Sequence, residues 1–355
     1  MDIRKLVKKE VAGLKAYSAK EIPCRIKLDA NESPYGFADA AKCIAGVKTN
    51  RYPDPEAKAL RRFIAKDLGV KPENILFGNG SDELIYYLIT TFGGPVAYPV
   101  PTFTMYGIIG QALGVKKKEI PLDKDFDIDI DKFLFVVKKE KPKLIFLSSP
   151  NNPTGNCFST DRILKIIEAS KGIVVVDEAY QPFSSENGML PLLKDYKNLI
   201  IMRTLSKIGL AALRLGFIIA MPGLIEEVNK VRLPFNVNAL SQAVAVAALK
   251  GKKEFRSSIK TIVAERERLL EAMETIEGIT PFPTEANFIL FRVDDPDQVY
   301  SALLKKGVLV RDIKSVVKGC LRVTVGTPEE NAAFLRALRG VLRRTYGPLR
   351  GRDLI

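Results

Sequence analysis

The chain has 355 residues, of which 46% are hydrophobic, a net charge of +14 and no histidine. Without an imidazole, Ser-His-Asp hydrolysis, Cys-His proteolysis and zinc sites that use histidine are excluded. Proton transfer must therefore rely on Lys, Tyr, Asp, Glu or Cys side chains, or on a cofactor. The four cysteines are far apart and form no CxxC pair, so we expect no metal site and a reduced, cytoplasmic protein.

The basic excess is concentrated at the two ends of the chain. Residues 1–28 hold eight Lys or Arg against three acids, and residues 336–355 hold six Arg against one Asp. No nucleic-acid-binding motif accompanies these charges, so we interpret them as solvated terminal helices and expect no nucleic-acid partner. The N-terminus also lacks the apolar core of a secretory signal.

Residues 84–115 carry no charged side chain and are numerous enough to span a bilayer. Glycines at 93 and 94 and prolines at 95, 99 and 101 interrupt this stretch in its middle. A membrane-spanning helix tolerates such interruptions poorly. We therefore expect these residues to form buried protein interior, and we expect no membrane partner.

Between residues 74 and 222, short apolar runs alternate with amphipathic stretches. Strands that are apolar on both faces and separated by helices predict a mostly parallel sheet with helices on both faces. The sequence therefore predicts an α/β large domain over residues 48–250. The runs that are each expected to form a strand ending in a loop are residues 74–80, 142–155, 172–180, 198–207 and 216–222. The expected helices include residues 82–92 and 160–171.

From about residue 251 the pattern changes. A long charged helix is predicted over residues 252–275, and a final helix starts at about residue 328. We expect a smaller α+β domain over residues 251–355, which the N-terminal segment 1–47 completes. The apolar segments expected to form its strands, mostly antiparallel, are residues 286–293, 303–313 and 319–327.

Polar residues follow four of the predicted strands, and ligands of open α/β sheets collect at the carboxyl ends of strands. The apolar run before Asp177 and Glu178 is similar to a Walker B strand. An ATPase would also need Gly-Lys followed by Ser or Thr, which the chain lacks. Asp177 then has two open interpretations: a cap of the next helix, or a carboxylate that holds a cationic ring nitrogen.

Lys207 directly follows another apolar strand. The dipeptide Ser-Lys also occurs at 170–171 and is uninformative by itself. In apolar surroundings, however, an ammonium group is destabilised, and the neutral amine can attack a carbonyl as a Schiff-base lysine must. Ser206 and Arg214 would flank Lys207 with a hydroxyl and a guanidinium, which suit a phosphate group.

Further residues at the predicted strand ends complete this set. The predicted helix that opens at Ser81 and Asp82 offers backbone N–H groups that favour phosphate. Tyr106 adds an aromatic face, and Asn152 and Tyr180 add hydrogen-bonding groups. Together with the lysine and the aspartate, these residues are the inventory that pyridoxal phosphate needs.

In their order and in their residues, these segments resemble those of the fold-type I pyridoxal-phosphate-dependent aminotransferases, and within them those of the histidinol-phosphate aminotransferases. SPNNPTG (149–155) and DEAY (177–180) are shared with many aminotransferases. LDANESPYG (28–36), RYPDP (51–55) and GCLRVTVG (319–326) are more particular to the histidinol-phosphate branch. The other matching segments, in family order along nearly the whole chain, are GNGSDELI (78–85), PTFTMYG (101–107), RTLSKIGLAALRLGF (203–217), EANFILF (285–291) and VLVRD (308–312).

The resemblance implies a role for each residue of the predicted site. It makes Lys207 the Schiff-base lysine, Asp177 the partner of the pyridinium nitrogen and Tyr106 the side chain that stacks on the ring. Asn152 and Tyr180 would bond the ring oxygen. The residues implied at the cofactor phosphate are Ser81, Asp82, Ser206 and Arg214.

The resemblance also implies a dimer and a reaction. Tyr52 is similar to a tyrosine that reaches the cofactor phosphate of the neighbouring subunit, which implies a homodimer with shared active sites. The implied reaction moves an amino group between L-histidinol phosphate and 2-oxoglutarate in histidine biosynthesis. The residues implied at the substrate are Tyr17, Asn31, Arg311 and Arg322.

Alternatives stay open at this point. An aromatic amino-acid aminotransferase or a threonine-phosphate decarboxylase on the same scaffold would also need Arg311 and Arg322 to bind an anion. A nucleic-acid-binding protein that has lost catalysis need not keep Lys207, Asp177 and Asn152, all of which are present.

The chain departs from the commonest family spacing in one respect. Arg214 follows Lys207 by seven residues instead of eight. We therefore expect a tightened turn after the lysine.

Overall fold

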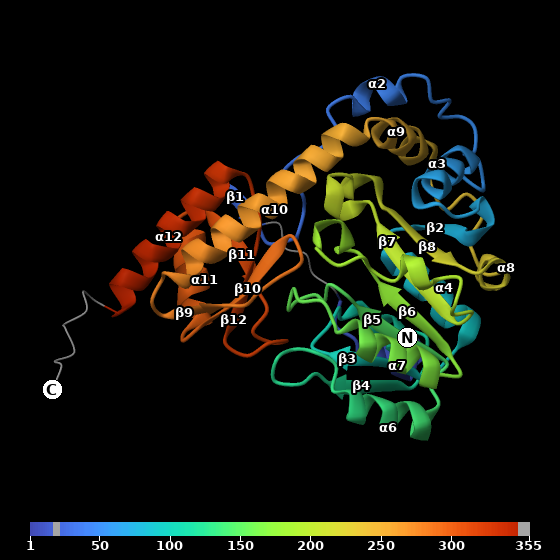
Figure 1. Ribbon diagram of the computed structural model, residues 1–355, viewed down its shortest axis with the longest axis horizontal. Coiled ribbons are helices and arrows are strands. Elements are labelled where there is room, and N and C mark those ends of the chain that lie inside the picture. Colours follow the sequence, from blue (N-terminus) through green and yellow to red (C-terminus); the bar gives the residue numbers. More distant parts are fainter. Residues whose placement is uncertain (17–21, 347–355) are drawn as a thin grey trace.

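The structure, a computed structural model, describes residues 1–16 and 22–346 and contains a large and a small β-sheet (Figure 1). The large sheet has the order β2-β8-β7-β6-β5-β3-β4. Only β8 runs antiparallel to its neighbours, which confirms the expected mostly parallel sheet. Its strands are β2 (Ile75–Asn79), β3 (Val96–Val100), β4 (Lys117–Pro121), β5 (Leu144–Ser148), β6 (Ile173–Asp177), β7 (Leu199–Thr204) and β8 (Leu215–Ala220).

Both faces of the large sheet are covered by helices, because successive side chains of a strand point to opposite faces. In β6, Val174 and Val176 join one hydrophobic cluster, whereas Val175 joins the other. The helices over the first face are α3 (Lys58–Leu68), α6 (Ile130–Glu140), α7 (Thr160–Ala169) and α9 (Ala239–Lys250). Those over the second face are α4 (Ser81–Phe92), α5 (Met105–Ala112) and α8 (Pro222–Asn229).

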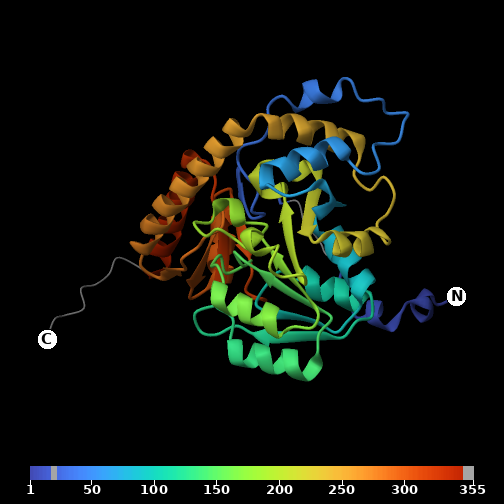
Figure 2. The same cartoon turned by 45° about the vertical axis from the view of Figure 1, so that its right-hand side comes forward.

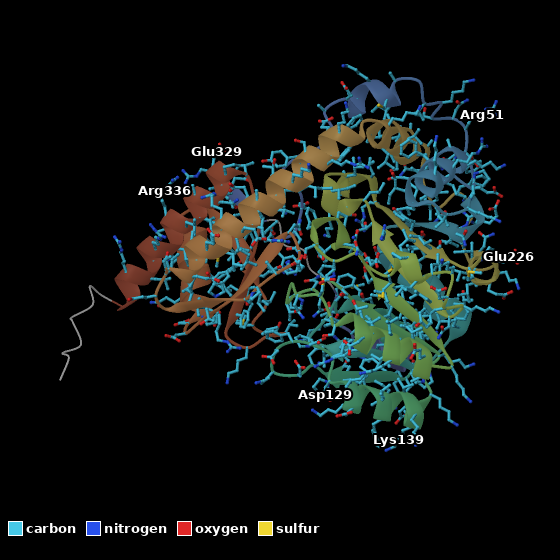
Figure 3. All side chains as sticks on the ribbon, in the orientation of Figure 1. Arg51, Asp129, Lys139, Glu226, Glu329 and Arg336 are labelled. Atoms are coloured by element: carbon cyan, nitrogen blue, oxygen red, sulfur yellow. The ribbon has the colours of Figure 1, made fainter. Side chains whose placement is uncertain are left out.

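The outer faces of these helices carry the charged residues. Lys139 of α6 and Glu226 of α8 are exposed and project away from the sheet (Figure 3). The charge-free stretch 84–115 forms much of α4, β3 and α5, and most of its residues are buried or half-buried, as expected. None of the helices in the described part of the chain is long and apolar enough to cross a membrane.

The small sheet has five strands in the order β1-β11-β12-β10-β9. All its pairs are antiparallel except β1 with β11. The strands are β1 (Ile26–Leu28), β9 (Ile279–Pro281), β10 (Phe288–Val293), β11 (Val308–Asp312) and β12 (Cys320–Thr324). Packed on this sheet are α10 (Lys252–Glu274), α11 (Pro296–Lys305) and α12 (Pro328–Tyr346), and α10 lies beside α12 (Figures 1 and 2).

The N-terminal segment divides between the two sheets. Among the described residues of the segment 1–47, only those of β1 join the small sheet. In the short helix α1 (Lys9–Ala12), the carbonyl of Glu10 accepts from Gln111 Nε2 of α5 (3.2 Å), and α2 (Ala40–Ile44) packs against α9. We still propose a large domain over 48–250 and a small domain from 1–47 and 251–355, supported by the membership of the two sheets and by the break between α9 and α10 at Gly251.

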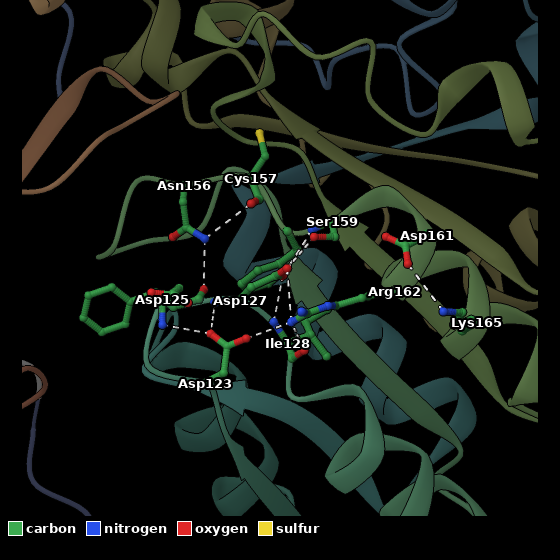
Figure 4. Close-up of polar contacts among 12 residues, drawn as sticks. Asp123, Asp125, Asp127, Ile128, Asn156, Cys157, Ser159, Asp161, Arg162 and Lys165 are labelled. Carbon is green, nitrogen blue, oxygen red and sulfur yellow. Dashed lines mark hydrogen bonds and ion pairs between the residues drawn. The ribbon is translucent and has the colours of Figure 1, made fainter.

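Ion pairs and hydrogen bonds hold the loop between β4 and α6 at the edge of the large sheet. Arg162 of α7 pairs with two aspartates of this loop, Asp123 (2.8 Å) and Asp127 (3.2 Å) (Figure 4). Asn156 Nδ2 donates to the carbonyl of Phe126 (2.9 Å) in the same loop. These contacts fix the loop that follows β5, which carries Asn152.

Candidate active site

A cavity of about 610 Å³ lies between the carboxyl ends of the large-sheet strands and the small sheet. Most of the residues that the sequence predicts for the site line it. From the large-sheet side these are Ser81, Asp82, Asn152, Asp177, Tyr180, Ser206, Lys207 and Arg214. Those associated with the small sheet are Asn31, Arg311 and Arg322. Tyr17 lies outside the described residues.

Asp177 is the last residue of β6, and only 4% of its surface is exposed. Burial raises the pKa of its carboxyl to about 6, although hydrogen bonds from Tyr106 and from the backbone of Ala179 oppose this shift. Tyr106 Oη donates to Asp177 Oδ2 (2.7 Å), and the N–H of Ala179 donates to Oδ1 (3.1 Å). Burial and the neighbouring carboxylate raise the pKa of Tyr106 well above its ordinary value, so the tyrosine keeps its proton.

The aromatic prediction needs a correction. Tyr106 is fully buried, its ring stacks on Phe146 (4.7 Å between centroids), and it does not line the cavity. The aromatic side chain of this segment that does line the cavity is Phe103. The physical reason is that α5 starts at Met105, so Tyr106 lies inside the first helical turn and faces the sheet, whereas Phe103 precedes the helix. The segment PTFTMYG (101–107) contains both aromatic residues, and its sequence alone does not indicate which of the two rings faces the cavity.

Lys207 lies in a 3-10 turn (Ser206–Ile208) that directly follows β7. Its Nζ is 5.8 Å from the centroid of the Tyr180 ring. The turn closes at Gly209, whose φ is 104°, and a Cβ there would lie 2.3 Å from the carbonyl oxygen of Tyr35. A second 3-10 turn (Ala211–Leu213) follows and ends at Arg214, so the shortened spacing is accommodated by two tight turns.

One end of the cavity carries groups that suit an anion. Helix α4 starts at Ser81, directly after Gly80. The guanidinium of Arg214 lies against Gly80, where a Cβ would be 2.5 Å from Nη2, and 3.6 Å from Asp82. Ser206 is buried and places its hydroxyl beside Thr204 Oγ1 (3.0 Å). A helix N-terminus, a hydroxyl and a guanidinium therefore meet at this end.

The small sheet contributes a pair of arginines. Arg311 of β11 and Arg322 of β12 are cross-strand partners and both line the cavity. Arg322 Nη1 donates to Asn152 Oδ1 (2.6 Å), and its guanidinium lies over the ring of Phe288 (5.1 Å). Because the amide oxygen of Asn152 accepts from Arg322, its NH2 group is available to the cavity.

Two other predicted residues, Asn31 and Tyr52, contact other side chains of the protein. Asn31 Nδ2 donates to Tyr180 Oη (2.9 Å) inside the cavity wall. Tyr52 is 82% exposed, does not line the cavity and stacks on Phe235 (4.5 Å between centroids).

The burial of Asp177 predicts a pH-dependent effect of Asp177→Asn on the ligand-free protein. The folded-state pKa is about 6, above the ordinary 3.8, so the wild type loses stability as the pH rises from about 4 through about 6 and loses no more above it. From pH 4 to pH 7, the variant should therefore gain about 2 kcal/mol in unfolding free energy relative to the wild type. Urea unfolding at a series of pH values measures this difference.

Asp129→Asn is the control with the opposite sign. The hydrogen bond from Lys132 lowers the pKa of Asp129, so this variant should lose stability relative to the wild type as the pH rises. A pH-independent difference between Asp177→Asn and the wild type would show that the buried carboxylate is not destabilised.

The chain is similar to known proteins over nearly its whole length. A family model described as aminotransferase class I and II matches residues 25–338. The chain is 44% identical over 346 residues to a histidinol-phosphate aminotransferase from Aquifex aeolicus, which covers 94% of this chain and 97% of that protein.

Solved structures share the fold. The histidinol-phosphate aminotransferase from Sinorhizobium meliloti in complex with pyridoxal-5'-phosphate matches with a TM-score of 0.85 at 24% identity, over 96% of this chain and 98% of that one. The L-threonine-O-3-phosphate decarboxylase from Porphyromonas gingivalis matches with a TM-score of 0.78 at 23% identity, over 90% and 99%. At these identities the likeness shows the fold alone, but the family match and the full-length relative confirm the resemblance. The chain therefore belongs to the aminotransferase class I and II family.

Proposed function

We propose that this aminotransferase uses pyridoxal 5'-phosphate to move an amino group between L-histidinol phosphate and 2-oxoglutarate, giving imidazole acetol phosphate and glutamate in histidine biosynthesis. The observation that carries the proposal is the meeting of two sets of side chains in one cavity. Lys207 and Asp177 come from the large sheet, and Arg311 and Arg322 come from the small sheet. The 44% identical relative from Aquifex aeolicus is named for the same substrate.

The donor set fits this cofactor. The anion-binding end formed by Ser81, Ser206 and Arg214 suits its phosphate, and the buried Asp177 carboxylate suits its cationic ring nitrogen. The primary amine of Lys207 lies in the same cavity. We assign Phe103, in place of Tyr106, to the face of the ring.

When bound, pyridoxal phosphate supplies a carbonyl that captures amines and a ring that accepts electrons. Lys207 supplies the amine that holds the cofactor and, once released, carries a proton to and from the substrate carbon. Asp177 keeps the ring nitrogen protonated, and Tyr106 keeps Asp177 oriented by its hydrogen bond. Asn152 and Tyr180 donate to the ring oxygen.

The arginine pair accounts for the two substrates. A phosphate dianion and a carboxylate both accept paired hydrogen bonds from guanidinium groups. Arg311 and Arg322 lie opposite each other on adjacent strands, so one anionic group can bind both. We propose the same pair for the phosphate of histidinol phosphate and for a carboxylate of glutamate.

We propose a homodimer in which Tyr52 completes the partner's site. Tyr52 is exposed, does not line the cavity of its own chain and stacks on Phe235. Leu233 and Leu240, which are close to Phe235 in the chain, are also exposed apolar side chains. An apolar surface of this kind suits a contact between two copies.

The proposed setting is the cytoplasm, without a nucleic-acid partner. All four cysteines are free, which suits a reducing compartment. The basic side chains of the first twelve residues are exposed, which suits a solvated surface.

The first prediction from this proposal concerns the lysine. Lys207→Ala should lower the rate of transamination by about 10³-fold or more, because it removes both the amine and the proton carrier. Lys171→Ala, in the other Ser-Lys pair, removes an exposed lysine and should leave the rate unchanged. Steady-state assays and circular dichroism of both variants give the comparison. A transamination rate for folded Lys207→Ala protein close to that of the wild type would refute the assignment.

The second prediction concerns the shared site. Tyr52→Ala and Lys207→Ala proteins are each expected to have little activity, but a mixture that has exchanged subunits should regain part of it. In the mixed dimer, one site combines the intact Lys207 of one chain with the intact Tyr52 of the other. If Tyr52 acts within its own chain, the mixture will stay as inactive as the two parents.

A further inference from the structure

Asn31 lies just after β1, and the small sheet fixes its backbone. Its φ is 54°, in the left-handed region that asparagine adopts more readily than most residues. Its N–H donates to Thr324 Oγ1 (2.9 Å), and its carbonyl accepts from Asn287 Nδ2 (3.1 Å). Only 1% of Asn31 is exposed, although it borders the cavity. Its polar groups are therefore engaged with the protein.

The side chain of Asn31 reaches across to the large-domain residue Tyr180. Asn31 Nδ2 donates to Tyr180 Oη (2.9 Å), and Thr324 Oγ1 donates to Asn31 Oδ1 (3.3 Å). The oxygen of Thr324 already accepts the backbone N–H of Asn31, so its own proton is free for the amide oxygen. This contact orients the amide with its nitrogen toward the tyrosine.

That orientation sets the direction of the hydrogen bond at Tyr180. An amide nitrogen donates but does not accept, and a phenol has a single proton. Because Tyr180 Oη accepts from Asn31, its own proton is left for an acceptor in the cavity that the tyrosine lines. The ring of Tyr180 packs edge-on against Phe288 of β10 (5.1 Å, 82°), which holds the hydroxyl in place.

We propose that Asn31 is a positioning residue that directs the hydroxyl proton of Tyr180 into the cavity, and that Asn31 does not itself bind the substrate. The inference rests on the proposed function, in which the acceptor is the ring oxygen of pyridoxal phosphate. Since Thr324 of β12 holds the amide and Tyr180 follows β6, this donor depends on the placement of the small sheet against the large one.

Other charged groups face the same region. Lys207 Nζ lies 5.8 Å from the centroid of the Tyr180 ring, and Asp177 lines the same cavity. Arg322 lies over Phe288, which packs against Tyr180. A test must therefore separate the direction of a hydrogen bond from a change in charge.

Asn31→Asp makes that separation possible, because aspartate has the same size and also tolerates a positive φ, but its carboxylate only accepts. Tyr180 would then donate to Asp at position 31 and lose its donor function toward the cavity. The readout is the pH midpoint of the absorption band of bound pyridoxal phosphate, measured for the wild type, Asn31→Asp, Tyr180→Phe and the double variant. A donor stabilises the ionised ring oxygen, so each single variant should raise the midpoint by about one unit.

The double variant decides between the two causes. If Asn31 acts through the tyrosine, Asn31→Asp adds little to the midpoint once Tyr180 is Phe. A wild-type midpoint in Asn31→Asp would overturn the proposal, and so would a shift that persists undiminished in the Tyr180→Phe background, because it would reflect the new charge alone.

A second measurement does not use the cofactor. Asn31→Gly keeps the left-handed backbone and removes the amide, and the unfolding of ligand-free Asn31→Gly, Tyr180→Phe and double-variant proteins can be compared. Coupled residues give a double-variant loss smaller than the sum of the single losses, whereas additive losses would overturn the contact. If the wild type binds no pyridoxal phosphate at all, the proposed function fails, while this comparison still tests the contact between Asn31 and Tyr180.

Discussion

The arrangement of the cavity depends on the burial of the Asp177 carboxylate. Burial raises its pKa to about 6, and the donors on Tyr106 and Ala179 offset only part of the cost of ionising it. A buried charge of this kind needs a cationic partner, and the ring nitrogen of the proposed cofactor is such a group. Because β6 lies between β5 and β7, the loop with Asn152 and the turn with Lys207 gather around the same carboxylate.

The small sheet completes the cavity with contacts that cross to the large sheet. Arg322 reaches Asn152, and Asn31 reaches Tyr180, so both residues proposed to donate to the ring oxygen are oriented from the opposite side. Arg322 also faces the space for the substrate anion together with Arg311. The placement of one sheet against the other therefore links the substrate side of the cavity to the cofactor side.

The sequence predicts the strands whose local pattern is strong and misses those whose pattern is weak. Strands β2 and β5 to β8 were expected because each is an apolar run with a distinct end. Strand β3 lies within the uninterrupted charge-free stretch 84–115, and the edge strand β4 carries lysines and a glutamate, so neither has a clear signal. The choice between Tyr106 and Phe103 depends on where α5 starts, which no spacing rule supplies. The contact between Asn31 and Tyr180 joins residues 149 positions apart and has no local signature.

The most direct test of the central claim is the absorption spectrum of the protein with bound pyridoxal phosphate, before and after L-histidinol phosphate is added without a keto acid. The account predicts that the cofactor band bleaches to that of the amine form, because the lysine, the carboxylate and the arginine pair act on one substrate in one cavity. A band that persists with histidinol phosphate but bleaches with phenylalanine would contradict the substrate assignment. If no band forms after pyridoxal phosphate is added, the role of Lys207 is wrong.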